Sequence, residues 1–331
     1  MMGPGDDLES LSKNNDHLGV LRYIRAHELR ESEKVIQHGQ ALLGEHVKKS
    51  KSGLRDEAAR SAALEQICLA AIDIDNHLLA ERCLDELKQT STGGAISGGG
   101  KNKDGSLVKD SDRYRRLLGR CLEAANDYEG ALLLYEKMLK ENPSNLIALQ
   151  RKYCILRQQK SDTGGGVTPM NVVLEALNEY LGQQLSDVSG WYEMSQLRLS
   201  LADFKGAAYA LEQVILGSPL DADIHRELGE VYATIGGVEY STYARKHMAQ
   251  ALELDPTNIR AQFGLLCVAN QYLDESKSSS KKNIDEHERL VAKELVKYGA
   301  DSVSKSYKGS KDPKMIATVK RVIDDYTENL E

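Results

Sequence analysis

The stretch DRYRRLLGRCLEAANDYEGALLLYEKMLKENP, residues 112–143, decides the fold class. Two small residues in it, Gly119 and Ala131, stand where two consecutive helices would cross, and a small residue on each side lets the two backbones approach closely. Tyr135 supplies bulk beside that crossing, and Pro143 ends the second helix because proline cannot continue its hydrogen-bond ladder. The stretch therefore predicts an antiparallel helical hairpin.

The same spacing returns further along the chain, with small residues at the crossings and large ones beside them. It is found again from Val188 and from Ala222, where Gly236-Gly237 lengthens the turn, and a degenerate copy spans Leu146–Asp187. Its large, small and terminating positions are Trp191, Ala207, Leu211 and Pro219 in one copy and Leu228-Gly229, Tyr232, Ala244, Met248 and Pro256 in the other. The spacing is that of tetratricopeptide repeats, whose hairpins stack because one hairpin cannot bury its apolar face alone. We therefore predict an all-α fold class, a tetratricopeptide-repeat solenoid of stacked antiparallel helical hairpins.

The repeats organise the rest of the chain around them. We predict a single tetratricopeptide-type solenoid over residues 1–331, with degenerate N-terminal helical hairpins at 18–90 and the best-defined repeats at 112–272. Between these parts, residues 91–111 include GGAISGGGKNKDGS, which predicts a Gly/Ser-rich loop. Residues 284–331 are expected to form C-terminal capping helices that close the stack.

The charge, the cysteines and the lengths of the apolar runs argue against a nucleic-acid-binding, secreted or membrane-spanning protein. The 43 basic and 50 acidic residues give a net charge of -7, which argues against nucleic-acid binding by bulk attraction. The five cysteines are odd in number and form no C-x-x-C pair, which favours free thiols in a reducing compartment. The N-terminal residues lack the apolar run of a signal peptide, and no stretch approaches the length of a membrane span. We expect a cytosolic protein without a membrane span of its own.

Motifs for catalysis, cofactors and metals fail on inspection. SGGGK at Ser97–Lys101 lacks the earlier glycine and the following Ser or Thr of a phosphate-binding loop. DIDN at Asp73–Asn76 lacks the glycine and terminal glutamate of a calcium loop and is expected to be a turn between helices. His287-Glu288 has no second histidine four residues on, and the eight histidines are scattered. We predict no catalytic residue, no cofactor, no metal and no small-molecule substrate.

One charged stripe is a candidate binding site. Arg113, Arg116 and Arg120 share one helix face and take positions 2, 5 and 9 of the repeat, which line the concave groove in this architecture. Arginine forks suit carboxylates, so an acidic partner segment would fit them. The alternative is a solvated face that keeps the protein soluble. Tyr192 and Arg226 take position 5 in later repeats and are weaker candidates.

Three stretches resemble the subunit 2 family of the endoplasmic reticulum membrane protein complex. They are VLRYIRAHELRESEKVIQHGQALL at Val20–Leu43, DYEGALLLYEKMLKENPSN at Asp127–Asn145 and ARKHMAQALELDPTNIRAQFGL at Ala244–Leu265. The resemblance implies a non-catalytic scaffold, peripheral at the cytoplasmic face of that membrane. It would dock the cytosolic segments of membrane-embedded subunits of a complex that inserts tail-anchored and multispanning proteins. The sequence departs from the family in the Gly-rich insertions Thr92–Gly105 and Gly164–Gly166.

A second function remains open, that of a tetratricopeptide cochaperone or adaptor binding acidic peptide tails. The cochaperone clamp is similar in fold, and it needs lysine at position 5 and asparagine at position 9 of its first helix. Here Arg116 and Arg120 hold those positions, and Gln150 and Cys154 hold them in the next repeat. The clamp therefore does not carry over residue by residue, and capture of soluble chaperones rather than membrane proteins would distinguish the two functions.

Overall fold

The computed structural model describes residues 4–43, 57–91, 112–158, 169–278 and 286–328, which hold helices and no strand. The predicted all-α fold class is confirmed. Contacts divide the chain into two compact units, unit 1 at Met1–Ala176 and unit 2 at Leu177–Glu331. The predicted Gly/Ser-rich loop lies outside the described residues except for Ser91, and the single continuous solenoid stays a prediction.

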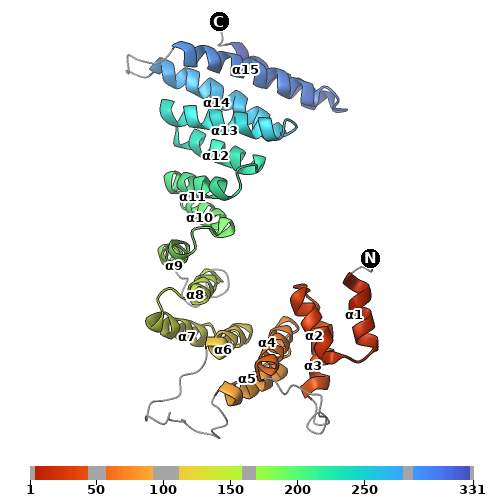
Figure 1. Cartoon of the computed structure of the whole chain (residues 1–331). Helices are drawn as coiled ribbons and strands as arrows, with labels where there is room; N and C mark the ends of the chain where they lie inside the picture. The colour runs from red at the N-terminus through yellow and green to blue at the C-terminus, as the bar shows by residue number, and fades with distance from the viewer. Residues whose placement is uncertain (1–3, 44–56, 92–111, 159–168, 279–285, 329–331) are drawn as a thin grey trace. The chain divides into compact units, whose positions relative to one another are not determined.

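Unit 1 is built from short helices that follow one another along the chain (Figure 1). They are α1 (Pro4–Lys13), α2 (His17–Ala26), α3 (Ser32–Leu43), α4 (Glu57–Asp73), α5 (His77–Ser91), α6 (Asp112–Ala124), α7 (Tyr128–Glu141) and α8 (Leu146–Gln158), and α9 (Met170–Gln183) crosses into unit 2. The sequence did not predict α1, whose first turn is polar. Leu8 explains it, because this side chain is buried in the core of the unit.

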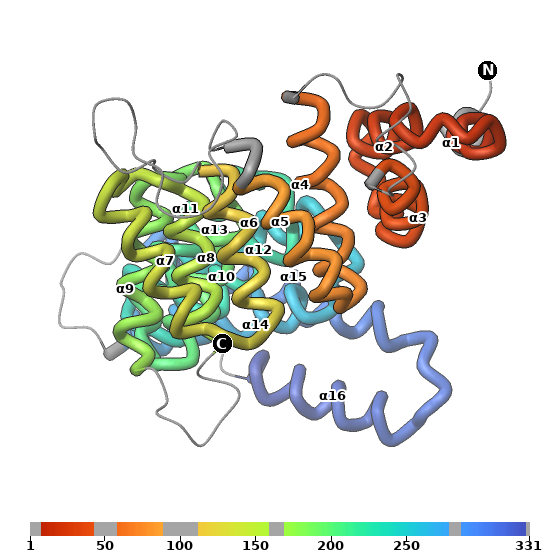
Figure 2. Tube along the Cα trace, turned by 90° about the horizontal axis from the view of Figure 1, so that it is seen from below, coloured from red at the N-terminus to blue at the C-terminus, as the bar shows by residue number. Residues whose placement is uncertain are grey.

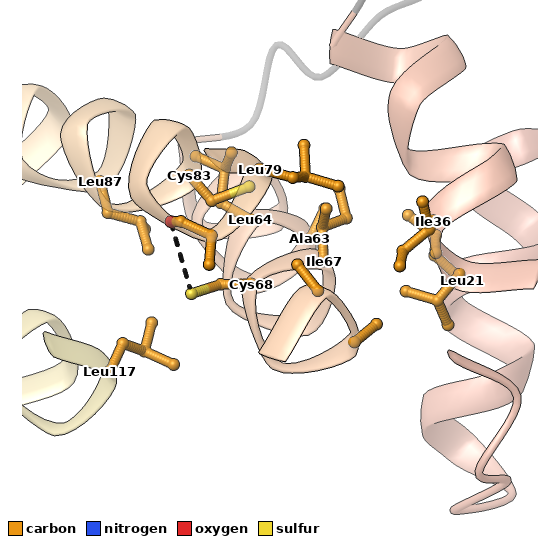
Figure 3. Packing of buried hydrophobic residues seen from close by; sticks show 14 of the residues in the cluster. Leu21, Ile36, Ala63, Leu64, Ile67, Cys68, Leu79, Cys83, Leu87 and Leu117 are labelled. Atoms are coloured by element: carbon orange, nitrogen blue, oxygen red, sulfur yellow. Dashed lines mark hydrogen bonds between the residues drawn. The ribbon is translucent and has the colours of Figure 1, made fainter. Parts of the chain in front are cut away.

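The core of unit 1 runs through α4, which is covered on two sides. Figure 3 shows Leu21 and Ile36, from α2 and α3, facing Ala63 and Ile67 of α4. On the other side of α4, Leu117 of α6 joins the same cluster. Apolar side chains from consecutive hairpins therefore share one core, and no hairpin of this cluster buries its apolar face by itself.

Unit 2 continues the pattern with longer helices. They are α10 (Val188–Ser200), α11 (Phe204–Gly217), α12 (Ala222–Ile235), α13 (Val238–Leu254), α14 (Ile259–Ser278), α15 (Glu286–Tyr307) and α16 (Pro313–Thr327). Each packs mainly on its neighbours along the chain, and Figure 1 shows α10 to α15 following one another in chain order. Trp191, at a predicted packing position, is buried. Gly236 and Gly237 have φ angles of 73° and 91°, which explains why this lengthened turn uses glycine.

The predicted close approach of α6 and α7 is present. Ala131 is fully buried, and a Cβ added at Gly119 would lie 2.3 Å from the hydroxyl oxygen of Tyr135. That hydroxyl donates to Glu123 Oε1 at 2.7 Å, and Arg151 of α8 donates through Nε to the same oxygen at 2.9 Å. The small residue thus leaves room for an aromatic ring whose polar end joins three consecutive helices.

An aspartate three residues before a glycine starts four of the described helices. The aspartate carboxylate accepts a hydrogen bond from the glycine backbone N–H at 2.9 to 3.0 Å, which satisfies a donor that a helix start leaves unpaired. The pairs are Asp16–Gly19, Asp127–Gly130, Asp187–Gly190 and Asp203–Gly206. The predicted turn at Asp73–Asn76 is confirmed as a related arrangement, since Asp75 has φ 56° and the Asn76 side chain accepts from Leu79 N.

We predict that Asp203→Ala lowers the free energy of unfolding by about 1 kcal/mol at neutral pH, as for other helix caps. The backbone N–H of Gly206 and the guanidinium of Arg198 hold the pKa of Asp203 below its usual range. A lowered pKa means that the ionised cap stabilises the fold above the ordinary aspartate pKa, and that this contribution is lost as pH falls through the folded-state pKa. Urea unfolding at neutral and acidic pH measures the effect, with Asp85→Ala as the control because Asp85 is exposed within α5. An equal loss at both pH values would contradict the prediction.

Candidate partner-binding surface

Arg113 and Arg116 lie on the same face of α6, as predicted, and both meet one carboxylate. Glu65 of α4 lies 3.1 Å from Arg113 Nε and 3.7 Å from Arg116 Nη2. The two arginine side chains are 43% and 37% exposed, so these ion pairs are screened by water and contribute little stability. Two guanidinium groups share one carboxylate, which leaves this face with an excess of positive charge.

Arg120 lies about two helical turns further along α6 and is partly exposed. It has no carboxylate partner within the described part of the chain. Its charge acts on its neighbours: burial and then the nearby Arg120 lower the pKa of Arg151. Of the three predicted arginines, Arg120 therefore presents its charge with the least compensation.

A hollow of about 610 Å³ adjoins the stripe in unit 1. Its apolar lining comes from Ile24, Leu29 and Leu69, and Arg25, Arg30 and Arg113 stand at its polar positions. We call these six residues the arginine hollow. Within it, Arg25 donates to the Ala62 carbonyl at 3.0 Å, and Arg30 lies 3.4 Å from Asp73. Glu28 and Glu65 also line the hollow, so three guanidinium groups stand against two carboxylates at its edge. An apolar floor with this excess of positive charge suits a segment that carries both apolar and acidic side chains.

Sequence reasoning missed Arg25 and Arg30 because the repeat pattern is degenerate before the best-defined repeats. Without a register, no position in α2 or in the turn after it could be assigned to a groove. The available signal was the resemblance of Val20–Leu43 to the family, which includes both residues. That resemblance indicated that the segment as a whole belongs to the family, and it did not distinguish Arg25 and Arg30 from the other side chains of the segment.

Arg226 and Tyr192 are brought together in unit 2, and they meet the same glutamate. Arg226 is buried and lies 3.3 Å from Asp223, 3.4 Å from Glu227 and 2.9 Å from Glu230. Burial works to lower its pKa, yet the hydrogen bonds and charges of these carboxylates raise the pKa of Arg226. The Tyr192 hydroxyl lies 3.5 Å from Glu227 Oε1. Arg226 is thus surrounded by carboxylates of its own helix, and its predicted place in an open groove does not match this burial.

Arg115 is a structural arginine that the repeat pattern did not reveal. It takes the large packing position of its hairpin, and its side chain is 7% exposed. Its Nη1 donates to Glu141 Oε2 at 2.7 Å, and its Nη2 donates to Asp112. The pattern asks only for bulk at this position, so the residue type alone could not separate this inward-facing arginine from Arg113 and Arg116.

Comparison with known proteins places these residues in a family. The family model described as "EMC2 TPR-like repeat domain" matches residues 107–248. ER membrane protein complex subunit 2-A of Xenopus laevis is 31% identical over 286 residues, which cover 86% of this chain and 83% of that protein. The chain belongs to the ER membrane protein complex subunit 2 family. Its resemblance to that family is confirmed.

Other relatives carry the same subunit name. The Xenopus tropicalis subunit 2 is 32% identical over 261 residues, covering 79% of this chain and 77% of that protein. The Dictyostelium discoideum subunit 2 is 27% identical over 241 residues, covering 72% and 66%. The match to the family model, at residues 107–248, begins before α6 and ends within α13. It therefore includes all five predicted site residues and excludes α15 and α16. Within the ranges described above, no helix is long and apolar enough to cross a membrane.

Proposed function

We propose that the chain is a non-catalytic scaffold subunit of the ER membrane protein complex, peripheral at the cytoplasmic face of the endoplasmic reticulum membrane. It docks the cytosolic segments of membrane-embedded subunits and so supports insertion of tail-anchored and multispanning proteins. Family membership is the observation that carries this proposal. Stacked helical hairpins support it, because they offer extended surfaces for partner segments.

The docking surface of the proposal is the arginine stripe, Arg113, Arg116 and Arg120, together with the arginine hollow beside it. An arginine fork forms paired hydrogen bonds with a carboxylate, and such contacts strengthen when water is excluded. The apolar floor at Ile24, Leu29 and Leu69 supplies that exclusion. An acidic cytosolic segment with a few apolar side chains would therefore bind here.

Neutralising the stripe tests the proposal. We expect Arg113→Gln, Arg116→Gln and Arg120→Gln together to lower recovery of at least one membrane-embedded partner several-fold in co-purification from detergent-solubilised membranes. Glutamine is chosen over glutamate because Glu65 already faces two of these positions, and added carboxylates there would repel it. Wild-type recovery is expected to fall with added salt, since the contacts are partly exposed ion pairs.

The matched control changes three exposed basic residues elsewhere, Arg22→Gln, Arg82→Gln and Lys137→Gln, and alters net charge equally. It is expected to recover every partner at the wild-type level. Circular dichroism of both variants checks that the helices are intact. Equal recovery by the folded stripe variant would make the stripe a solvated face, and recovery of soluble chaperones in place of membrane proteins would favour the cochaperone function.

A further inference from the structure

A second hollow, outside the stretch that matches the family model, lies between α15 and α16 in unit 2. Its volume is about 820 Å³, and its apolar lining comes from Ala300, Tyr307, Ile316, Val319 and Ile323. We call it the α15–α16 groove. Figure 2 shows α16 at the edge of the unit, joined to α15 by a short turn.

The apolar face of α16 is only half covered by the rest of the unit. Towards its C-terminal end, Ile323 and Tyr326 pack on the cluster formed by α14 and α15, and Cys267 of α14 lies 3.4 Å from the Tyr326 hydroxyl. Towards its N-terminal end, Met315 and Ile316 are 46% and 39% exposed. One end of α16 is therefore fixed to the unit, and the other end presents apolar surface into an open groove.

The net charge of the residues that line the groove is positive, whereas that of the whole chain is negative. Lys297, Lys305, Lys308 and Lys320 line it, against Asp301 and Asp324. None of the four lysines forms an ion pair within the part of the chain that the structure describes. The protein as a whole has a net charge of -7, so a basic groove on it is a local departure. Apolar surface edged with unpaired lysines selects for an occupant that is apolar on one face and acidic on its flanks.

We propose that the α15–α16 groove binds an acidic amphipathic helix of a partner protein. The partner helix would lay apolar side chains spaced by three or four residues onto Ile316, Val319 and Tyr307, with its carboxylates near the lysines. Charge argues against a second copy of α16 as the occupant, because Lys314, Lys320 and Arg321 outnumber Asp324 and Asp325 on that helix and leave it with a net positive charge. The proposal goes beyond the scaffold function by assigning a second binding surface, and it does not depend on the arginine stripe.

The probes are four synthetic helical peptides that separate the requirement for an apolar face from the requirement for acidic flanks. One has a leucine face with glutamate flanks, and the second keeps the leucine face with lysine flanks. The third and fourth have the same two kinds of flank with serine in place of leucine. Fluorescence anisotropy with the full chain is expected to show binding of the acidic leucine peptide, with affinity at least about tenfold higher than for the other three.

Two variants locate the binding site. Lys305→Glu with Lys320→Glu reverses the charge of the groove, and Ile316→Ser removes an exposed apolar contact without opening a buried cavity. Each is expected to weaken binding of the acidic leucine peptide by about tenfold or more. The control is Lys137→Glu with Lys246→Glu, which makes the same change in net charge at exposed lysines on other helices. It is expected to bind the peptide like the wild type, and circular dichroism checks the helix content of all three proteins.

Several outcomes would overturn the proposal. The first is equal affinity for all four peptides, or no binding of any. A second is wild-type affinity in both groove variants, which would place the peptide elsewhere. The last arm uses vesicles of phosphatidylcholine and phosphatidylserine: binding to these that is lost in the groove variants, without peptide binding, would assign the groove to a membrane surface instead.

Discussion

Gly119→Ala is expected to lower the free energy of unfolding by about 2 kcal/mol, although alanine is the better helix former. The added Cβ would lie 2.3 Å from the Tyr135 hydroxyl oxygen and 2.8 Å from its ring carbon Cε1. Tyr135 is fully buried and its hydroxyl is bonded to Glu123, so the ring cannot move aside without losing that hydrogen bond. The loss of fit and the disturbed contact outweigh the gain in helix propensity.

Gly182→Ala supplies the matched control for this prediction. The same substitution near the end of α9 meets no atom within 4 Å, and we expect it to stabilise the protein by up to about 0.5 kcal/mol. Urea unfolding followed by circular dichroism measures both variants. The sign is the decisive result, since two glycine-to-alanine changes that both stabilise would contradict the predicted contact of α6 with α7.

Glu288→Ala is expected to cost about 3 kcal/mol, because it leaves a buried charge without its partner. Arg245 is 4% exposed, its Nη2 donates to Glu288 Oε2 at 2.7 Å, and its guanidinium lies 4.0 Å from the centre of the Tyr272 ring. Through this contact Arg245 joins α13 to the start of α15. Removing the carboxylate would force the guanidinium to stay desolvated and unpaired or to pull α15 away.

Removing the arginine instead of the glutamate is expected to lower the free energy of unfolding by less. Arg245→Met removes the buried charge and keeps an unbranched apolar chain against Tyr272, while Glu288, 39% exposed, returns to water. We expect its cost to be about 1 kcal/mol, mainly from the lost contact with the aromatic face. Thermal and urea unfolding of the two single variants and the double variant form a cycle that isolates the pair. A greater loss for Arg245→Met than for Glu288→Ala would contradict this account.

The hairpins could be predicted from the sequence because their contacts follow a fixed register. Gly119, Ala131 and Tyr135 mark one helix crossing, and the same geometry places Ala207 and Ala244 in the core of later hairpins. A repeated crossing leaves a repeated pattern of small and large residues. The degenerate hairpins before α6 lack that pattern, and the sequence predicted their helices from apolar periodicity alone.

The burial and ion-pair partners of each charged residue could not be predicted, because they depend on how neighbouring helices pack, which the repeat pattern does not specify. Glu65, which meets Arg113 and Arg116, comes from α4, in a hairpin without register. Arg226 has the same repeat position as Arg116, yet it is buried and paired with Asp223, Glu227 and Glu230 of its own helix. The α15–α16 groove depends on how far α16 departs from its neighbours, which apolar periodicity cannot specify.

The packing of each helix on the next has a kinetic consequence. Among the described helices, the substantial contacts join helices one or two places apart along the chain. Such a protein has low contact order, so little loop-closure entropy is lost before stabilising contacts form, and folding is expected to be fast for its length. Synthesis at the ribosome delivers α1 first and α16 last, in the order in which the contacts are made. Within each unit, a hairpin can then add to the one before it during translation, and exposed apolar surface stays confined to the growing end.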